Sequence, residues 1–101
     1  MKKDNIRSAV AEVISEVFAE EKFESGMIDT VDLVDDFGME SITFISLIMA
    51  LETKFVIRIP DAMIKAENFR KIDNIAIIVE GELTKQKEML SDTRDGNMMD
   101  F

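Results

Sequence analysis

The feature that most constrains the fold is a helical pattern from Ser41 to Phe55 that carries two apolar stripes. At about 100° per residue, the first stripe contains side chains spaced three and four positions apart: Phe44, Leu47, Ile48, Leu51 and Phe55. The second stripe, centred roughly 130° away by the same period, contains Ile42, Ile45 and Met49. Because a small bundle buries one broad stripe per helix, the first stripe predicts a core face. The second indicates either a docking surface or a central helix that is buried on most sides.

Ser41 opens this helix directly after Gly38, Met39 and Glu40. An unmodified serine in this place is a good N-cap, because its hydroxyl can accept a hydrogen bond from a free amide of the first turn. The same place also suits an attached phosphate, since the free N–H groups and the positive end of the helix dipole stabilise an anion. The neighbouring carboxylate of Glu40 can supply an oxygen ligand to Mg²⁺ during phosphoryl transfer.

The segment from Phe37 to Asp61 reads F-G-M-E-S-I-x-F-x-x-L-I-M-A-L-E-x-x-F-x-I-x-I-P-D. It resembles the phosphopantetheine attachment region of acyl carrier proteins, whose usual form is L-G-x-D-S-L followed by the same helix and the same exit. With the apolar spacing on either side, the resemblance covers roughly residues 4 to 88. It implies a 4′-phosphopantetheine arm, derived from coenzyme A, on Ser41. The fold we expect is all-α, a small bundle of three longer helices and one short helix.

Three residues depart from the pattern of this family. Glu40 replaces the usual Asp, which keeps the carboxylate but lengthens its reach by one methylene. Val56 replaces the glycine that usually ends the helix, which predicts a helix end without a glycine left-handed cap. Phe44 replaces a small residue, and its ring is expected to fill the space that a buried long chain would need. We therefore expect a small, polar or exposed cargo.

The resemblance implies a discrete acyl carrier that catalyses nothing itself. Such a protein holds an acyl, aminoacyl or polyketide intermediate as a thioester and presents it to other enzymes. The implied partners of this monomer are a phosphopantetheinyl transferase and the enzymes that load and use the acyl group. The alternative is an unmodified helical adaptor that binds a partner through Ile42, Ile45 and Met49. In either case we expect close contact through these three side chains and long-range attraction through the acids of helix one and the loop before Ser41.

The composition excludes several classes of function. The chain has no His and no Cys, so Ser-His and Cys-His catalysis are impossible, and we expect neither catalytic residues nor a metal site. A net charge of -9 argues against nucleic acid as a partner, because phosphate binding needs clustered Lys and Arg. No apolar run approaches the ~20 residues of a membrane span, and no apolar segment follows the first lysines. We therefore expect a cytoplasmic protein.

Apolar spacing predicts two further long helices. The first extends from Asn5 to Ala19, and the last from an N-cap at Asp73 to near Gln86 or Glu88. Between the first helix and Ser41 we expect a long loop fastened by apolar side chains, namely Phe23, Ile28, Val31, Leu33, Val34 and Phe37. A short helical turn is predicted within residues 61 to 66, after Pro60. The folded domain is thus expected at 1–88, with a disordered tail at 89–101.

Overall fold

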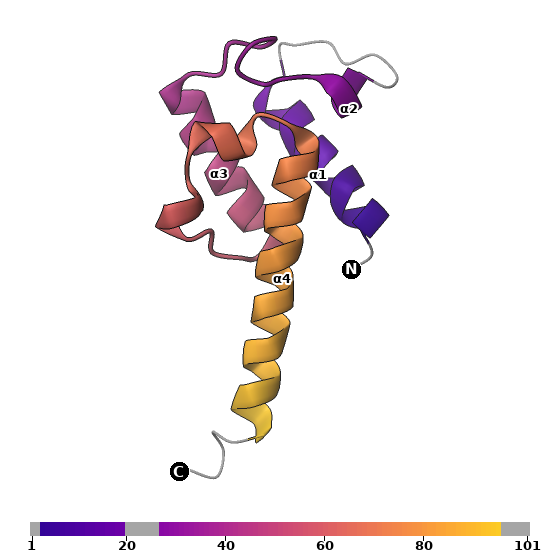
Figure 1. Cartoon of the computed structure of the whole chain (residues 1–101), viewed down its shortest axis with the longest axis vertical. Helices are drawn as coiled ribbons and strands as arrows, with labels where there is room; N and C mark the ends of the chain where they lie inside the picture. The colour runs from indigo at the N-terminus through magenta and orange to yellow at the C-terminus, as the bar shows by residue number, and fades with distance from the viewer. Residues whose placement is uncertain (1–2, 20–26, 96–101) are drawn as a thin grey trace.

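The computed structural model describes residues 3–19 and 27–95, and every regular element in that part of the chain is helical (Figure 1). The elements are α1 (Lys3–Val17), α2 (Met27–Thr30), α3 (Ser41–Phe55), the 3₁₀ turns η1 (Asp61–Met63) and η2 (Ala66–Phe69), and α4 (Ile72–Asp95). The predicted all-α bundle with three longer helices is confirmed. The single short turn expected at 61 to 66 is instead a pair of 3₁₀ turns, and the four-residue helix α2 is an addition within the predicted loop.

The three long helices lie side by side, with α1 in contact with both α3 and α4 (Figure 1). Residues 27–40, which include α2, cross the end of the bundle at which α3 begins. At the opposite end α4 continues past the other elements and gives the molecule a long axis of 52 Å, against 26 and 19 Å in the other two directions. The start of α3 therefore lies far from the free end of α4.

The core confirms the apolar stripes read from the sequence. It is built from the inward faces of α1, α3 and α4, and none of its members among the described residues is polar or charged. The first stripe of α3 is inside the bundle, with Phe44 half-buried and the others buried: Leu47, Ile48, Leu51 and Phe55. Within the loop, Val31 and Leu33 are buried, and the ring of Phe37 packs against Phe18 with centroids 5.4 Å apart. Of the other expected loop anchors, Val34 is half-buried, while Phe23 and the side chain of Ile28 lie outside the described residues.

Both ends of α4 differ from the prediction. The helix begins at Ile72, so Asp73 lies inside the first turn and is not the N-cap. The helix continues to Asp95, beyond the end expected near Gln86 to Glu88. The physical reason is that the strong helix formers after Gly81 meet no further glycine and no proline before residue 96. Residues 89–95, which the sequence analysis assigned to the tail, thus continue α4 in the structure, and residues 96–101 lie outside the described part.

The end of α3 also corrects an expectation. Val56 adopts the left-handed conformation, with φ 54° and ψ 53°, so a left-handed cap is present with valine in place of glycine. The N–H groups of Val56 and Ile57 both donate to the carbonyl of Glu52, the second over 3.1 Å. The side-chain amide of Gln86 donates to the carbonyl of Val56 over 2.8 Å. These bonds hold a β-branched residue in a conformation that it rarely adopts.

Candidate attachment site at the start of α3

Ser41 is the first helical residue of α3, and the N-cap position before it is occupied by Glu40. Glu40 has extended backbone angles of φ -104° and ψ 173°, and its carbonyl accepts the first hydrogen bond of the helix from Phe44 N–H, over 2.8 Å. Of the two roles considered for Ser41, the structure does not show that of the N-cap, because the serine lies one position after it. Both Glu40 and Ser41 are exposed.

The Glu40 side chain makes no capping hydrogen bond, and no other side chain among residues 3–19 and 27–95 caps the start of α3. Helix geometry gives the N–H groups of the first turn no acceptor within the helix, and here the side chain at the N-cap does not supply one. These donors and the positive end of the helix dipole therefore remain available to an anion beside Ser41. The exposed hydroxyl and the unused donors together suit a phosphate ester on this serine.

Three exposed apolar side chains continue from Ser41 along the same side of α3. They form what we call the apolar strip, with exposed fractions of 80% for Ile42, 58% for Ile45 and 61% for Met49. Met49 also lines a groove of about 350 Å³ between α1 and α3, together with Val13, Glu16, Ala50, Thr53 and Lys54. A central helix buried on most sides is thus excluded, and the second stripe is part of the surface.

Phe44 points away from this strip and into the bundle. Its half-buried ring lies against the fully buried ring of Phe69 in η2, with centroids 5.6 Å apart and planes tilted by 55°. Phe44 belongs to α3 and Phe69 to η2, so the two rings pack together where these elements meet. The structure therefore keeps Phe44 on the inward stripe with which the sequence analysis grouped it.

The loop before Ser41 is organised by Asp32. One carboxylate oxygen of Asp32 accepts the N–H groups of Val34 and Asp35, each over 2.9 Å, and so caps a single helical turn at residues 33–37. The N–H of Asp32 in turn donates to the carboxylate of Asp36 over 2.8 Å. The turn ends at Gly38, whose φ of 64° is natural for glycine.

The guanidinium of Arg70 fastens this turn to the segment before α4. Its Nε lies 3.1 and 3.0 Å from the two carboxylate oxygens of Asp32, and its Nη2 lies 2.7 Å from Oδ2 of Asp35. The hydrogen bond from Arg70, aided by the N–H of Asp35, holds the pKa of the Asp32 carboxyl below its ordinary value of 3.8. The bond to Asp32 likewise raises the pKa of Arg70.

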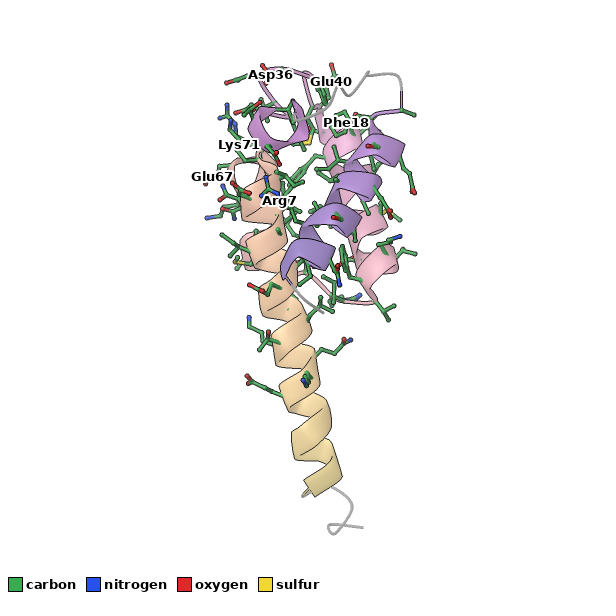
Figure 2. The ribbon with its side chains drawn as sticks, turned by 90° about the vertical axis from the view of Figure 1, so that its right-hand side faces the viewer. Arg7, Phe18, Asp36, Glu40, Glu67 and Lys71 are labelled. Atoms are coloured by element: carbon green, nitrogen blue, oxygen red, sulfur yellow. The ribbon has the colours of Figure 1, made fainter. Side chains whose placement is uncertain are left out.

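A second arginine ties the same end of the bundle together. Arg7 of α1 pairs with Asp29 of α2 and with Asp73 in the first turn of α4. Figure 2 shows Arg7 between these helices and places Asp36 and Glu40 at the end of the molecule away from the free end of α4. Several of the loop's acids therefore serve to hold the structure, while Asp36 and Glu40 remain exposed close to Ser41.

The sequence analysis missed Asp32, Arg70 and Glu52. Asp32 precedes a short segment that ends at Gly38, and an aspartate before a turn with a glycine after it is a known capping pattern. The capping role of Asp32 could therefore have been predicted. The carboxylate of Glu52 accepts the N–H of Ile59 over 2.8 Å, and Arg70 pairs with acids more than thirty residues away. Neither of these two contacts can be predicted from a pattern of neighbouring residues.

The comparisons with known proteins agree with this geometry. A family model described as the phosphopantetheine attachment site matches residues 6–76. Acyl carrier proteins of Campylobacter jejuni subsp. doylei and Campylobacter fetus subsp. fetus are 36% identical over 72 residues and 31% identical over 78 residues. The first alignment covers 71% of this chain and 83% of that relative, and the second covers 77% and 91%. No solved structure gives a significant match.

These matches define a phosphopantetheine-bearing carrier domain. More narrowly, the chain belongs to the acyl carrier protein family. It is therefore a carrier and not a catalyst, it bears a covalent 4′-phosphopantetheine group, and its partners are a phosphopantetheinyl transferase and acyl-handling enzymes. Within the described residues, no helix combines the length and apolarity needed to cross a membrane.

Proposed function

We propose that Ser41 carries the 4′-phosphopantetheine arm of a discrete, cytoplasmic, monomeric carrier. The observation that carries this proposal is an exposed serine hydroxyl at the start of a long helix whose first-turn donors are left without a side-chain cap. The attached phosphate would lie beside these donors, which stabilise its charge. The exposed carboxylate of Glu40 is in place to bind Mg²⁺ while the group is transferred.

The cargo of this carrier is an acyl, aminoacyl or polyketide intermediate. When attached, the arm supplies a thiol that holds such a group as a thioester. The chain itself has no Cys, so the arm is the only source of this chemistry in the protein. The residues of the protein hold the arm, present it and bind the enzymes that act on the cargo.

Intact mass after treatment with a phosphopantetheinyl transferase and coenzyme A tests the attachment. The wild-type chain should gain the mass of one phosphopantetheine, and Ser41→Ala should gain none while keeping its helical circular dichroism. Ser46→Ala is the matched control, because Ser46 is also exposed and lies one turn further along α3. A wild-type chain that gains no mass would favour the unmodified adaptor, and a modified Ser41→Ala would move the site elsewhere.

We infer that partners make close contact with the apolar strip. A desolvated apolar side chain can act as a hot spot, whereas exposed charges mainly set the encounter rate and the salt dependence. Ile45→Ala should weaken binding to the cognate enzyme about tenfold. Ile77→Ala on α4 is the matched control, because Ile77 is 59% exposed and Ile45 is 58% exposed. A neutral Ile45→Ala together with a steep loss of binding between low and physiological salt would show that docking is electrostatic.

Glu52 is unsuited as the acidic control in that experiment. Its side chain is half-buried, and its carboxylate accepts a backbone hydrogen bond from Ile59. Replacing it would disturb the end of α3 as well as the surface charge. Asp36→Asn tests the charge of the docking face more cleanly, because Asp36 is exposed and the amide keeps an oxygen for the N–H of Asp32.

We also propose that Phe44 limits the size of the buried cargo. The Phe44–Phe69 pair fills the space beside the start of α3, and adding atoms to a packed interior is costly. Attached long-chain and acetyl groups should therefore hydrolyse from the wild-type carrier at similar rates. Phe44→Ala should slow hydrolysis of the long chain alone, and Phe37→Ala, which removes a ring packed at a tilt against Phe18, should not. Strong protection of the long chain in the wild type would overturn this limit.

A further inference from the structure

Arg70 holds the turn that leads to Ser41 through both its side chain and its main chain. The carbonyl of Arg70 accepts the N–H of Leu33 over 2.8 Å, while the guanidinium binds Asp32 and Asp35. The Leu33 side chain is fully buried between these contacts. The turn at residues 33–37 is thus held against the bundle by the buried Leu33, by the ring of Phe37 on Phe18 and by the hydrogen bonds of Arg70.

The segment directly before Ser41 is attached to this turn. Gly38 N–H donates to the carbonyl of Val34, and Met39 N–H donates to the carbonyl of Leu33, each over 2.9 Å. A Cβ added at Gly38 would meet no atom within 4 Å, so side-chain packing does not hold the chain at that point. The next residue, Met39, is half-buried against the core, so the turn and Met39 together set the position of Glu40 and Ser41.

The ion pair of Arg70 with Asp35 is poorly placed to stabilise the fold, although the other partner, Asp32, is only 14% exposed. The side chain of Arg70 is 36% exposed and that of Asp35 is 68% exposed, and pairs that reach solvent in this way contribute little to stability. Their geometry is nevertheless specific, because a planar guanidinium that meets two carboxylates fixes direction as well as distance. The main effect of Arg70 is thus on the orientation of the loop.

We propose that Arg70 is a positioning residue for the transfer of phosphopantetheine to Ser41, an inference that rests on the proposed function of that serine. In this transfer the Ser41 oxygen bonds to the pantetheine phosphorus of coenzyme A. The bond from phosphorus to the adenosine bisphosphate oxygen breaks, and the serine proton passes to a base of the enzyme. Arg70 touches none of these atoms. It holds residues 38–40 at the angle at which the transferase meets the hydroxyl and the carboxylate of Glu40 together.

The test compares Arg70→Ala and Arg70→Lys with the charge-matched control Lys87→Ala, at an exposed position on α4. Both Arg70 variants should lower kcat/KM for modification by about tenfold, since a misplacement of about 1 Å can cost up to ~100-fold. Lysine keeps the positive charge but lacks the planar guanidinium that binds two carboxylates at once. Arg70→Lys should therefore behave like Arg70→Ala. In the same samples the Gly38 and Met39 amides should exchange hydrogen severalfold faster, while the melting temperature falls by less than about 4 °C.

Different results overturn different claims. A wild-type rate in Arg70→Lys would show that only the charge matters and would overturn the positioning role. Provided that the wild-type chain is modified, two further results would overturn the positioning role. One is unchanged amide exchange in Arg70→Ala, and the other is an equal loss of rate in Lys87→Ala. Should Arg70→Ala fail to fold, Asp35→Ala removes one of the two carboxylates that the guanidinium binds and should reproduce the loss of rate in part. If wild-type protein is not modified at all, the proposed function fails first.

Discussion

The two ends of α3 differ in whether their free backbone groups find hydrogen-bond partners. At the C-terminal end, backbone N–H groups close on the carbonyl of Glu52, its carboxylate binds Ile59, and Gln86 binds the carbonyl of Val56. At the N-terminal end, the position of the cap holds a glutamate that makes no capping bond, next to exposed Ser41. An absent cap typically costs about 1 kcal/mol of stability. The difference indicates that α3 is held in place at its C-terminal end, whereas its N-terminal end keeps free N–H groups beside the proposed attachment site.

The largest effect on stability should come from opening the closed end at Glu52. In Glu52→Ala the N–H of Ile59, in a half-buried contact, loses its acceptor, which should lower the free energy of unfolding by about 2 kcal/mol. Glu52→Gln keeps an acceptor oxygen and should lose less than half as much. Urea unfolding monitored by circular dichroism measures both. Equal stability of Glu52→Ala and wild type would show that the closed end contributes nothing.

A smaller, stabilising effect is expected at Val56. Valine in the left-handed region costs about 1–2 kcal/mol, glycine adopts it freely, and the 74% exposed side chain gives up little burial. After allowing for the entropy of glycine, Val56→Gly should raise the free energy of unfolding by about 1 kcal/mol. Val56→Ala is the control and should gain much less. A loss of stability in Val56→Gly would mean that the valine side chain makes a contribution that its exposure does not suggest.

Supplying a better cap at the open end should have a still smaller effect. Glu40→Asp places a shorter carboxylate at the N-cap, where aspartate is preferred. The free energy of unfolding should rise by about 0.5 kcal/mol, and Ser41 should still accept the arm. Thermal unfolding and intact mass measure the two properties. A lower stability in Glu40→Asp would contradict the view that this helix start is uncapped.

The smallest effect concerns acid and the loop before Ser41. A carboxyl whose pKa is lowered in the folded state stabilises the fold fully above its unfolded pKa, and this contribution is lost as the pH falls through the folded pKa. For Asp32, whose ordinary pKa is 3.8, the loss therefore begins near pH 4 and continues below it. The melting temperature of the wild type should exceed that of Asp32→Asn at pH 7, and this difference should become smaller as the pH falls. A gap that is constant down to pH 3 would contradict the coupling to Arg70.

Local periodicity was sufficient to predict much of this molecule. The bounds of α3, its inward stripe and the existence of a second stripe at Ile42, Ile45 and Met49 follow from spacing within a single helix, whereas the exposure of the second stripe became clear only from the structure. The left-handed conformation of Val56 could not be predicted in this way, because its carbonyl is bound by the side chain of Gln86, thirty residues further along the chain. The same holds for the fork between Arg70 and Asp32, 38 residues apart. Contacts of this kind are set by the packing of α4 against the loop, which no local pattern encodes.

The most direct test of the account is to locate the arm in protein purified from its own host. Proteolysis followed by tandem mass spectrometry should find one phosphopantetheine on the fragment that contains Glu40, Ser41 and Ile42, with the modification at Ser41 itself. The fragments that contain the other serines should have their unmodified masses. A phosphopantetheine on any other residue, or a fragment around Ser41 that is always unmodified, would contradict the claim that the open end of α3 is the attachment site.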